Sequence, residues 1–445
     1  MPEKCYIYRR TVTKNMNKAI FKYFCLAALL VVACSHNEET KPKDNPKPQE
    51  PEDKPETQTG EIMPAWSEGN LDIHFINSGR GECTFYILPD GTTMVVDAGE
   101  FFPTDPTAQP QRPNASTPAY KTFGTYIKHF LPASSGGKID YMMLTHFHID
   151  HMGEMSSSNA IHPEGGYQIV GVSGLFEEVP FRNLIDRGYP TYEEDSYTFP
   201  TSESESTQNY IKFAKYVTSK KGVTGERFQV GSETQFKLLG ATKDTYEGKF
   251  RIFNHVGNGD GYYKGSNGEG FVDRRKPSTE NGASCGFHLQ YGKFDFIAAG
   301  DLVSVAQNFQ AYYYRDYVSY LEGFKSNHHL SANSWGGQMQ KYAFSPRVIV
   351  VQSFYEKQPD VDLLTSIFSG QFSSYNYTWE KDVYLTKSWD AKMEANKDLF
   401  SKVKAYGGHV VIRVAPGGGS FRVYMLKDTD FSYEIKSVSD EYICQ

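Results

Sequence analysis

The sequence predicts an α/β protein in which mixed β-sheets are covered by helices. Two observations predict this class. Short apolar segments follow one another with turn residues between them, and segments with helical spacing lie among them. Strands joined by tight turns are antiparallel, while interspersed helices cover the faces of a sheet. A composition of 39% apolar and 22% charged residues is ordinary for a globular protein.

The elements are expected in the following order. Residues 71–76 and 83–88 form two strands joined by a glycine-rich turn, and Asp90-Gly91 marks a hairpin before a third strand at 93–97. Helices are predicted at 123–131 and 303–320, and further strands at 138–144, 227–230, 235–239, 249–253, 285–290, 294–299, 346–353, 409–414 and 420–425. Residues 191–208, rich in Ser, Glu, Thr and Tyr, predict a surface insertion.

The N-terminus has the pattern of a secretory signal. A basic region with Lys14, Lys18 and Lys22 precedes an apolar run at residues 23–33. This run is too short for a bilayer, which requires about 20 residues, but it suits a signal peptide. Met16 is an alternative start, because residues 1–15 add nothing that a signal needs.

The end of this apolar run resembles the lipobox of bacterial lipoproteins. It reads Val31-Val32-Ala33-Cys34-Ser35, with a small residue directly before the cysteine. The resemblance implies that Cys34 becomes the acylated first residue of the mature protein. We therefore expect an exported protein that is anchored to a bacterial membrane by lipid alone, facing the periplasm or the cell surface.

A polar tract separates this anchor from the folded part. Residues 36–63 are rich in Pro, Glu, Lys and Asp and contain almost no apolar side chains. Such a composition cannot bury a core, and its prolines keep the chain extended. We therefore divide the chain into a signal peptide at 1–33, a disordered tether at 34–64 and one folded domain at 65–445.

The charge balance argues against stable nucleic-acid binding. Removal of residues 1–33 takes away six of the 46 basic and one of the 53 acidic residues, which leaves a formal charge of −12. High-affinity binding to phosphate backbones usually requires a basic face. The short basic run at 274–276 is expected to be solvated.

The strongest chemical motif follows the strand predicted at 138–144. His146, His148, Asp150 and His151 lie within six residues. Imidazole nitrogens and carboxylate oxygens are the ligands that zinc takes in sites open to water. In an extended segment, residues i and i+2 point the same way, so His146 and His148 can share one ion. The following turn can direct Asp150 and His151 to a second ion.

Two such ions would make a hydrolytic site without a Ser or Cys nucleophile. A pair of ions about 4 Å apart lowers the pKa of bound water and stabilises both the entering and the leaving oxygen. Zinc is the expected metal, although manganese and iron accept the same ligands. Asp150 is expected to orient the attacking water as well as to bind metal.

The motif His-x-His-x-Asp-His resembles the signature of the metallo-β-lactamase superfamily. Other segments agree with this resemblance, namely 74–83, 95–99, 281–285, 291–294, 299–301 and 327–329. Together they are similar to the hydrolase domain of ComEC-type competence proteins and to the teichoic-acid phosphorylcholine esterase. The resemblance covers about residues 71–335. It implies an αβ/βα sandwich of two mixed sheets flanked by helices, with the metals at one sheet edge.

The resemblance also implies further site residues. Asp301 would be the carboxylate that bridges both metals. His329 would be the last ligand of the second site and His328 a catalytic residue that faces the substrate or donates a proton, although the reverse assignment stays open. Many family members have one more histidine in the first site, for which His255 is the preferred candidate, ahead of His162 and His288. Arg187 is a candidate for binding an anionic substrate.

The predicted reaction is attack of a metal-bound hydroxide on a phosphodiester in a surface polymer, a lipid headgroup or a nucleic acid. Phosphodiesters are favoured because the relatives named above act on phosphate esters. Two alternatives stay open. The chain could be another hydrolase of the same fold, acting on lactones or β-lactams, or a surface lipoprotein that keeps its metal and only binds.

Overall fold

The computed structural model describes residues 59–445, except for 103, 193–203, 337–338, 340–343 and 370–380. These residues belong to one unit, Glu56–Gln445. The predicted signal peptide, the acylated Cys34 and the tether up to residue 58 lie outside the described residues. Residues 59–64 contact the domain, because Ile62 forms a bridge with Glu434 and Met63 is buried. Within the described ranges, no helix is long and apolar enough to cross a membrane.

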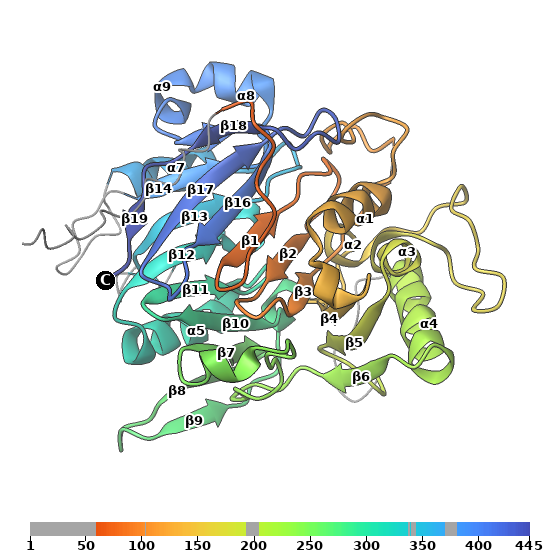
Figure 1. Cartoon of the computed structure of the whole chain (residues 1–445), viewed down its shortest axis with the longest axis horizontal. Helices are drawn as coiled ribbons and strands as arrows, with labels where there is room; N and C mark the ends of the chain where they lie inside the picture. The colour runs from red at the N-terminus through yellow and green to blue at the C-terminus, as the bar shows by residue number, and fades with distance from the viewer. Residues whose placement is uncertain (1–58, 103, 193–203, 337–338, 340–343, 370–380) are drawn as a thin grey trace, which may run out of the picture. The chain divides into compact units, whose positions relative to one another are not determined.

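The strands form two mixed sheets (Figure 1). The first sheet has the order β18-β17-β16-β1-β2-β3-β4-β5-β6, and β19 pairs with β17. Its strands are β1 (Leu71–Phe75), β2 (Thr84–Ile87), β3 (Thr93–Val96), β4 (Ile139–Met143), β5 (Phe181–Asp186), β6 (Thr224–Arg227), β16 (His409–Val414), β17 (Ser420–Leu426), β18 (Ile435–Val438) and β19 (Tyr442–Ile443).

The second sheet has the order β15-β14-β13-β12-β11-β10-β7-β8-β9. Its strands are β7 (Phe250–Gly257), β8 (Asp260–Lys264), β9 (Gly270–Asp273), β10 (Gly286–Tyr291), β11 (Phe294–Ala298), β12 (Leu321–Lys325), β13 (Pro346–Val351), β14 (Asp382–Leu385) and β15 (Ala405–Tyr406). The α-helices of the described chain are α1 (Ala119–Phe130), α2 (Ile149–Met152), α3 (Gly171–Glu178), α4 (Ser204–Lys220), α5 (Ser304–Tyr317), α7 (Val361–Phe368), α8 (Asp390–Ala395) and α9 (Lys397–Phe400).

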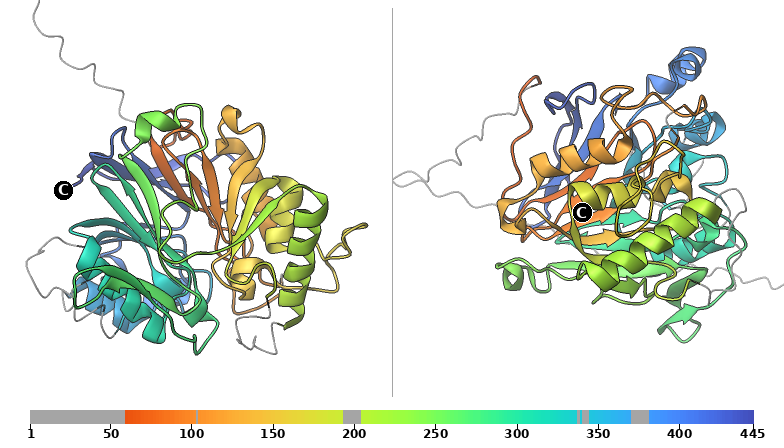
Figure 2. Two further views of the ribbon diagram at one scale, coloured as in Figure 1. Left: turned by 90° about the horizontal axis from the view of Figure 1, so that it is seen from below. Right: turned by 90° about the vertical axis from the view of Figure 1, so that its right-hand side faces the viewer.

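Three layers of apolar contact hold the sheets and helices together. Alternate residues of β13 show the principle: Val348 and Val350 pack between the two sheets, whereas Ile349 packs against the outer helices. One cluster joins α1, α3 and α4 to the first sheet, and another joins α5 and α7 to the second. Figure 2 shows helices on both outer sides of the strands. The predicted αβ/βα sandwich is therefore confirmed.

Some predicted elements differ from the structure. Residues 235–239 were predicted as a strand but form an irregular segment. Its apolar residue Phe236 packs into the core between the sheets without belonging to a strand. The strand predicted at 227–230 lies earlier, at β6. In the predicted insertion, residues 193–203 lie outside the described residues, while 204–208 begin helix α4. The segment after residue 335 supplies β13–β15 to the second sheet, as expected, but β16–β19 complete the first sheet.

The strand directions bring chemically active residues to one edge. β3, β4, β5 and β6 are parallel neighbours, and so are β11 and β12. The metal-type motif begins just after β4, Asp301 follows β11, and His328 and His329 follow β12. Since the carboxyl ends of parallel strands meet at one sheet edge, residues distant in sequence converge there.

Candidate metal centre

The loop after β4 presents His146 and His148 on the same side. His148 has an extended backbone and precedes the short helix α2, and His146 Nε2 lies 3.1 Å from His148 Nδ1. One ligand atom from each of these histidines and a carboxylate oxygen of Asp301 lie within 4.8 Å of one another. Burial lowers the pKa of both histidines, so their neutral, lone-pair-bearing form is favoured. The three residues form a first group suited to a metal ion.

A second group surrounds the other side of Asp301. His151 Nε2 lies 3.2 Å and His329 Nε2 lies 3.1 Å from Asp301 Oδ1. Asp150 Oδ2 lies 3.2 Å from His329 Nε2 and 3.7 Å from His151 Nε2. Asp301 therefore contacts both groups, and Asp150 lies beside the second one.

The ring orientations of His151 and His329 leave their Nε2 atoms directed into the site. His151 Nδ1 lies 2.8 Å from Asp97 Oδ2, and His329 Nδ1 lies 2.9 Å from the carbonyl oxygen of Gln352. These acceptors assign the proton of each ring to Nδ1. Both Nε2 atoms and Asp301 Oδ1 are buried and have no hydrogen-bond partner in the described structure. Three electron-rich atoms this close together require a shared cation or protons.

The electrostatics agree with a cation at this position. Burial alone would lower the pKa of His329, but the carboxylates of Asp301 and Asp150 outweigh it and raise the pKa to about 9. For the same reason the pKa of His151 lies well above its ordinary value. The carboxylates therefore make the electrostatic potential in the site strongly negative. Metal binding releases such protons, so these residues fit a divalent ion.

Asp97 supports the centre from outside. Besides His151, its carboxylate accepts hydrogen bonds from the backbone N–H and the hydroxyl of Thr145, both at 2.8 Å. The backbone of Asp97 is left-handed, with a φ of 61°. Partners of this kind orient metal-binding histidines and make them more basic. The segment 95–99 matches the family pattern in the sequence, but nothing in it identified Asp97 as the partner of His151.

Glu82 and Lys325 form a buried ion pair beside the second group. Their charged atoms are 2.6 Å apart, and both side chains are almost fully buried. Lys325 Nζ also donates to the carbonyl oxygen of Gly300, directly before Asp301. A carboxylate oxygen of Glu82 lies within 4.8 Å of the ligand atoms of His151, Asp301 and His329. Glu82 lies in segment 74–83, which resembles the family pattern, but nothing in the sequence pairs it with Lys325, which is 243 positions away.

His328 and His329 differ in exposure although they are neighbours. The His329 side chain is fully buried, whereas that of His328 is 24% exposed. His328 Nε2 lies 3.8 Å from Asp301 Oδ2, and its Nδ1 lies 2.7 Å from Asn333 Oδ1. Both residues and Leu330 have left-handed backbones, an arrangement that costs energy and is typical of functional sites. This geometry favours His329 over His328 as the metal-binding residue.

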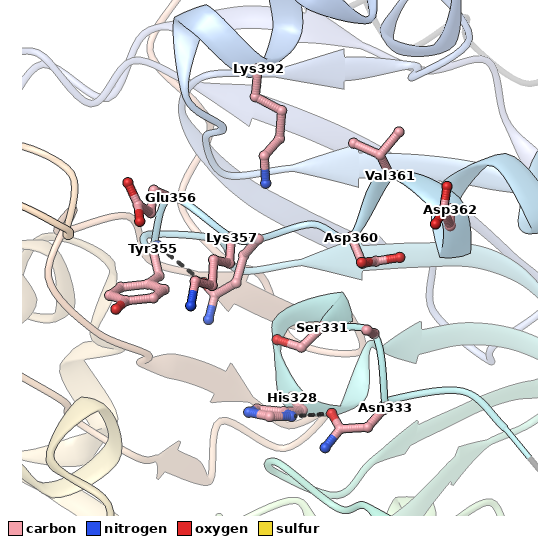
Figure 3. A pocket seen from close by; sticks show the side chains of 12 residues that line it. His328, Ser331, Asn333, Tyr355, Glu356, Lys357, Asp360, Val361, Asp362 and Lys392 are labelled. Atoms are coloured by element: carbon pink, nitrogen blue, oxygen red, sulfur yellow. Dashed lines mark hydrogen bonds between the residues drawn. The ribbon is translucent and has the colours of Figure 1, made fainter.

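A cavity of about 860 Å³ opens beside His328 (Figure 3). Tyr355, Lys357 and Lys392 line it, and Lys392 points into it from the side opposite His328. Its lining also includes Glu356, Asp360 and Asp362. The cavity gives a ligand access to the exposed edge of His328.

The structure corrects the hypothesis for Arg187. The side chain is only 1% exposed, and its Nε and Nη2 atoms donate to the Glu280 carboxylate at 2.8 and 2.6 Å. The guanidinium also lies over the ring of Phe147, 4.4 Å from its centre. Glu280 in turn accepts a hydrogen bond from Phe147 N. Arg187 therefore supports the loop between His146 and His148 from behind and is not exposed to substrate.

The candidates for a further ligand of the first group lie elsewhere. His255 is buried and stacks on Tyr313 of α5, and it belongs to neither metal-type group among the described residues. His288 is held by Asp295 at 2.6 Å and by the Tyr313 hydroxyl at 3.0 Å. His162 accepts a hydrogen bond from Gly165 N and stacks on Tyr167. The structure therefore does not bring any of the three into the first group.

The chain matches no protein-family model and no curated protein. The solved structures that it resembles include the following three, each of which is 11% identical to it. For CmlA, a diiron β-hydroxylase from Streptomyces venezuelae, the match covers 79% of this chain and 55% of CmlA, with a TM-score of 0.36. This chain thus spans about half the length of CmlA. For the short form of human tRNase Z, it covers 72% and 94%, with a TM-score of 0.30. For the hydrolase AbOPH of the β-lactamase superfamily, it covers 49% and 55%, with a TM-score of 0.25.

Proposed function

We propose that this chain is a phosphodiesterase of the metallo-β-lactamase superfamily that uses two divalent metal ions, with zinc as the expected metal. The observation that supports this most directly is that His151 Nε2 and His329 Nε2 lie 3.2 and 3.1 Å from Asp301 Oδ1, while none of these three atoms has a hydrogen-bond partner in the described structure. A buried site of this kind is costly without a cation.

Each ligand has a distinct place in this proposal. His146 and His148 would hold the first ion, Asp150, His151 and His329 would hold the second, and Asp301, which belongs to both groups, would serve both. When bound, the two ions lower the pKa of a bound water and stabilise charge on phosphoryl oxygens. Asp150 orients the water, because its Oδ2 faces the second group. His328, which keeps an exposed edge toward the cavity, donates a proton to the leaving oxygen.

The choice of a phosphodiester rests on the cavity and on the sequence resemblance. Lys357 and Lys392 line the cavity beside His328, together with Glu356, Asp360 and Asp362, and lysine ammonium groups bind phosphate oxygens. The motif pattern is similar to that of enzymes acting on phosphate esters. Lactone and β-lactam hydrolysis, and metal-dependent binding without catalysis, are the alternatives that an experiment must separate from this proposal.

The test uses the chain without residues 1–33, loaded with zinc, and bis-p-nitrophenyl phosphate as substrate. We expect two bound metals per chain, and we expect Asp301→Asn to lose both turnover and at least one metal. Asp398→Asn, a carboxylate on the exposed side of α9, is the matched control and should keep both. Two metals without turnover would shift the assignment to lactones or β-lactams, and then to binding alone if those also fail. Absence of metal would overturn the proposal.

We also propose that the protein is exported and anchored through a lipid on Cys34. The lipobox-like segment 31–35 and the polar tether support this location. Metabolic labelling with a radioactive fatty acid should mark the wild-type chain in a bacterial host and leave Cys34→Ala unlabelled. Equal labelling of both would contradict the anchor.

A further inference from the structure

A strongly basic pocket lies away from the metal-type groups. Its cavity measures about 760 Å³, and four basic residues line it: Arg227, Arg274, Arg275 and Lys276. Among the described residues that line it, Asp260 is the only acidic one. We call this feature the basic pocket. Such a concentration of positive charge contrasts with a chain whose formal charge is −7 overall.

The acidic residues in and beside the basic pocket, Asp260 and Asp273, are fewer than its four basic residues. Arg275 is paired with Asp273, at 2.9 Å. Burial raises the pKa of Asp260, although Arg274 and Arg227 act in the opposite direction. Arg274 and Lys276 are exposed. Guanidinium groups bind phosphate oxygens in pairs, and an added ammonium strengthens the field, so the pocket is suited to a phosphate group.

The basic pocket and the candidate metal centre lie on the same edge of the sandwich. β4, β5 and β6 are parallel neighbours (Figure 1). The metal-type motif follows β4, and the pocket residue Arg227 is the last residue of β6. On the second sheet, β7 and β11 both pair antiparallel with β10, and so run in the same direction. Asp301 follows β11, and the pocket residue Asn258 follows β7. Adjacent strands are about 4.8 Å apart, so the two spacings from β4 to β6 correspond to roughly 10 Å. Arg274 and Lys276 follow β9, which lies four spacings, roughly 20 Å, from β11 on the second sheet.

A chain of polar contacts connects the two places. Arg187 Nη1 donates to Asn258 Oδ1 at 3.5 Å, and the same guanidinium is held by Glu280. Glu280 accepts from Phe147 N, between His146 and His148. The lining residue Asn258 is thereby connected, through Arg187 and Glu280, to the loop that carries the first metal-type group.

From this placement we infer that the basic pocket binds a second phosphate group of the substrate, roughly 10–20 Å from the phosphodiester that is cleaved. The inference rests on the proposed function for the cleavage, but the binding of phosphate in the pocket does not depend on it. The substrate class is thus a compound with at least two phosphate groups that are several bonds apart.

The first experiment measures binding without catalysis. Inorganic pyrophosphate is titrated by calorimetry into the chain without residues 1–33, after the metal has been removed with a chelator. We expect the variant Arg274→Ala/Lys276→Ala to weaken binding roughly tenfold or more, because it removes two charge-assisted contacts. The control Lys215→Ala/Lys264→Ala removes the same charge from α4 and from the far end of β8, and should bind as the wild type does. If both double variants lost pyrophosphate affinity equally, or if the wild type did not bind pyrophosphate, the proposal that the basic pocket binds phosphate would be wrong.

The second experiment tests the substrate class with a matched pair. The first compound is p-nitrophenyl 6-hydroxyhexyl phosphate, and the second carries an additional phosphate on its terminal hydroxyl. We expect the zinc-loaded enzyme to prefer the second compound roughly tenfold in kcat/KM, and we expect Arg274→Ala/Lys276→Ala to lose that preference. Equal rates for both compounds would overturn the inference while leaving the proposed function intact. Pyrophosphate binding without hydrolysis of either compound would support the pocket and contradict the proposed phosphodiesterase.

Discussion

Asp97 Oδ2 lies 2.8 Å from His151 Nδ1, and both side chains are fully buried. This contact ties the end of β3 to the motif that follows β4. It assigns the ring proton to Nδ1 and leaves Nε2 free to face Asp301. The metal-binding capacity of His151 therefore depends on a residue that is not itself a ligand.

Replacement of Asp97 should weaken metal binding without removing a ligand. Asp97→Asn keeps the shape of the side chain but loses the charge that holds His151. We expect the affinity for zinc to fall about 10- to 100-fold. Competition with a chromophoric chelator measures this change, and Asp105→Asn serves as a control outside the cluster. An unchanged affinity would mean that His151 is oriented by other contacts.

His328 and His329 should respond in different ways to the same substitution. His329→Gln removes a nitrogen that faces Asp150 and Asp301, so metal should be lost along with activity. His328→Gln should keep the metal and lower kcat about 10²- to 10⁴-fold, as expected for a proton donor. Metal content and kcat measured on the same samples distinguish the two. The opposite pattern would assign the metal to His328.

Gly99 should tolerate no side chain. A Cβ atom at this position would lie 1.6 Å from the carbonyl oxygen of Asp150, whereas a Cβ at Gly419 would meet nothing within 4 Å. Gly99→Ala should displace the turn that holds Asp150 and His151, and lower the free energy of unfolding by about 1–3 kcal/mol or more. Urea unfolding and metal content measure both effects. Gly419→Ala is the matched control, and an equal effect of the two would contradict this explanation.

The pair of Asp72 and Arg413 should contribute to acid sensitivity. Burial alone would raise the pKa of Asp72, but Arg413, which donates at 2.6 Å, lowers it from 3.8 to about 2. The folded state therefore favours the ionised form, so its stabilisation is complete above pH 4 and is lost between pH 4 and pH 2. The contribution is on the order of 2 kcal/mol.

Urea unfolding at several pH values tests this pair. Asp72→Asn should lose about 3–5 kcal/mol at pH 7, because a buried guanidinium is left without its partner. The variant should then lose less stability than the wild type between pH 4 and pH 2. Asp398→Asn, on the exposed side of α9, should follow the wild-type curve. Parallel curves for Asp72→Asn and the wild type would exclude Asp72 as a source of the acid transition.

Arg187 should behave as a structural residue. Arg187→Met leaves Glu280 buried without a partner, so we expect the free energy of unfolding to fall by about 3–5 kcal/mol. Arg187→Met/Glu280→Gln should recover part of that loss. Thermal unfolding measures the stability, and KM for bis-p-nitrophenyl phosphate is measured alongside it. A raised KM with unchanged stability would restore the interpretation of Arg187 as a substrate contact.

The sequence determined much of the fold because its patterns are local. The alternation of apolar residues and the turn at Asp90-Gly91 are sufficient to predict β1–β3, since hairpin strands are neighbours in the chain. The same holds for β4 and for helices α1 and α5. Helix α4 was missed because its polar first turn resembles a loop, and the segment 235–239 was predicted as a strand because core contacts can also come from irregular chain.

Some residues of the candidate site could also be predicted from the sequence, and others were found only in the tertiary structure. His146, His148, Asp150 and His151 could be identified because one short loop carries all four, and motif resemblance added Asp301 and His329. The roles of Asp97, Glu82, Lys325 and Gln352 came only from the tertiary structure, since sheet order alone brings these residues to the same edge. The structure also decided against Arg187 and His255, because burial and the nearest partner of a side chain depend on contacts that no local pattern encodes.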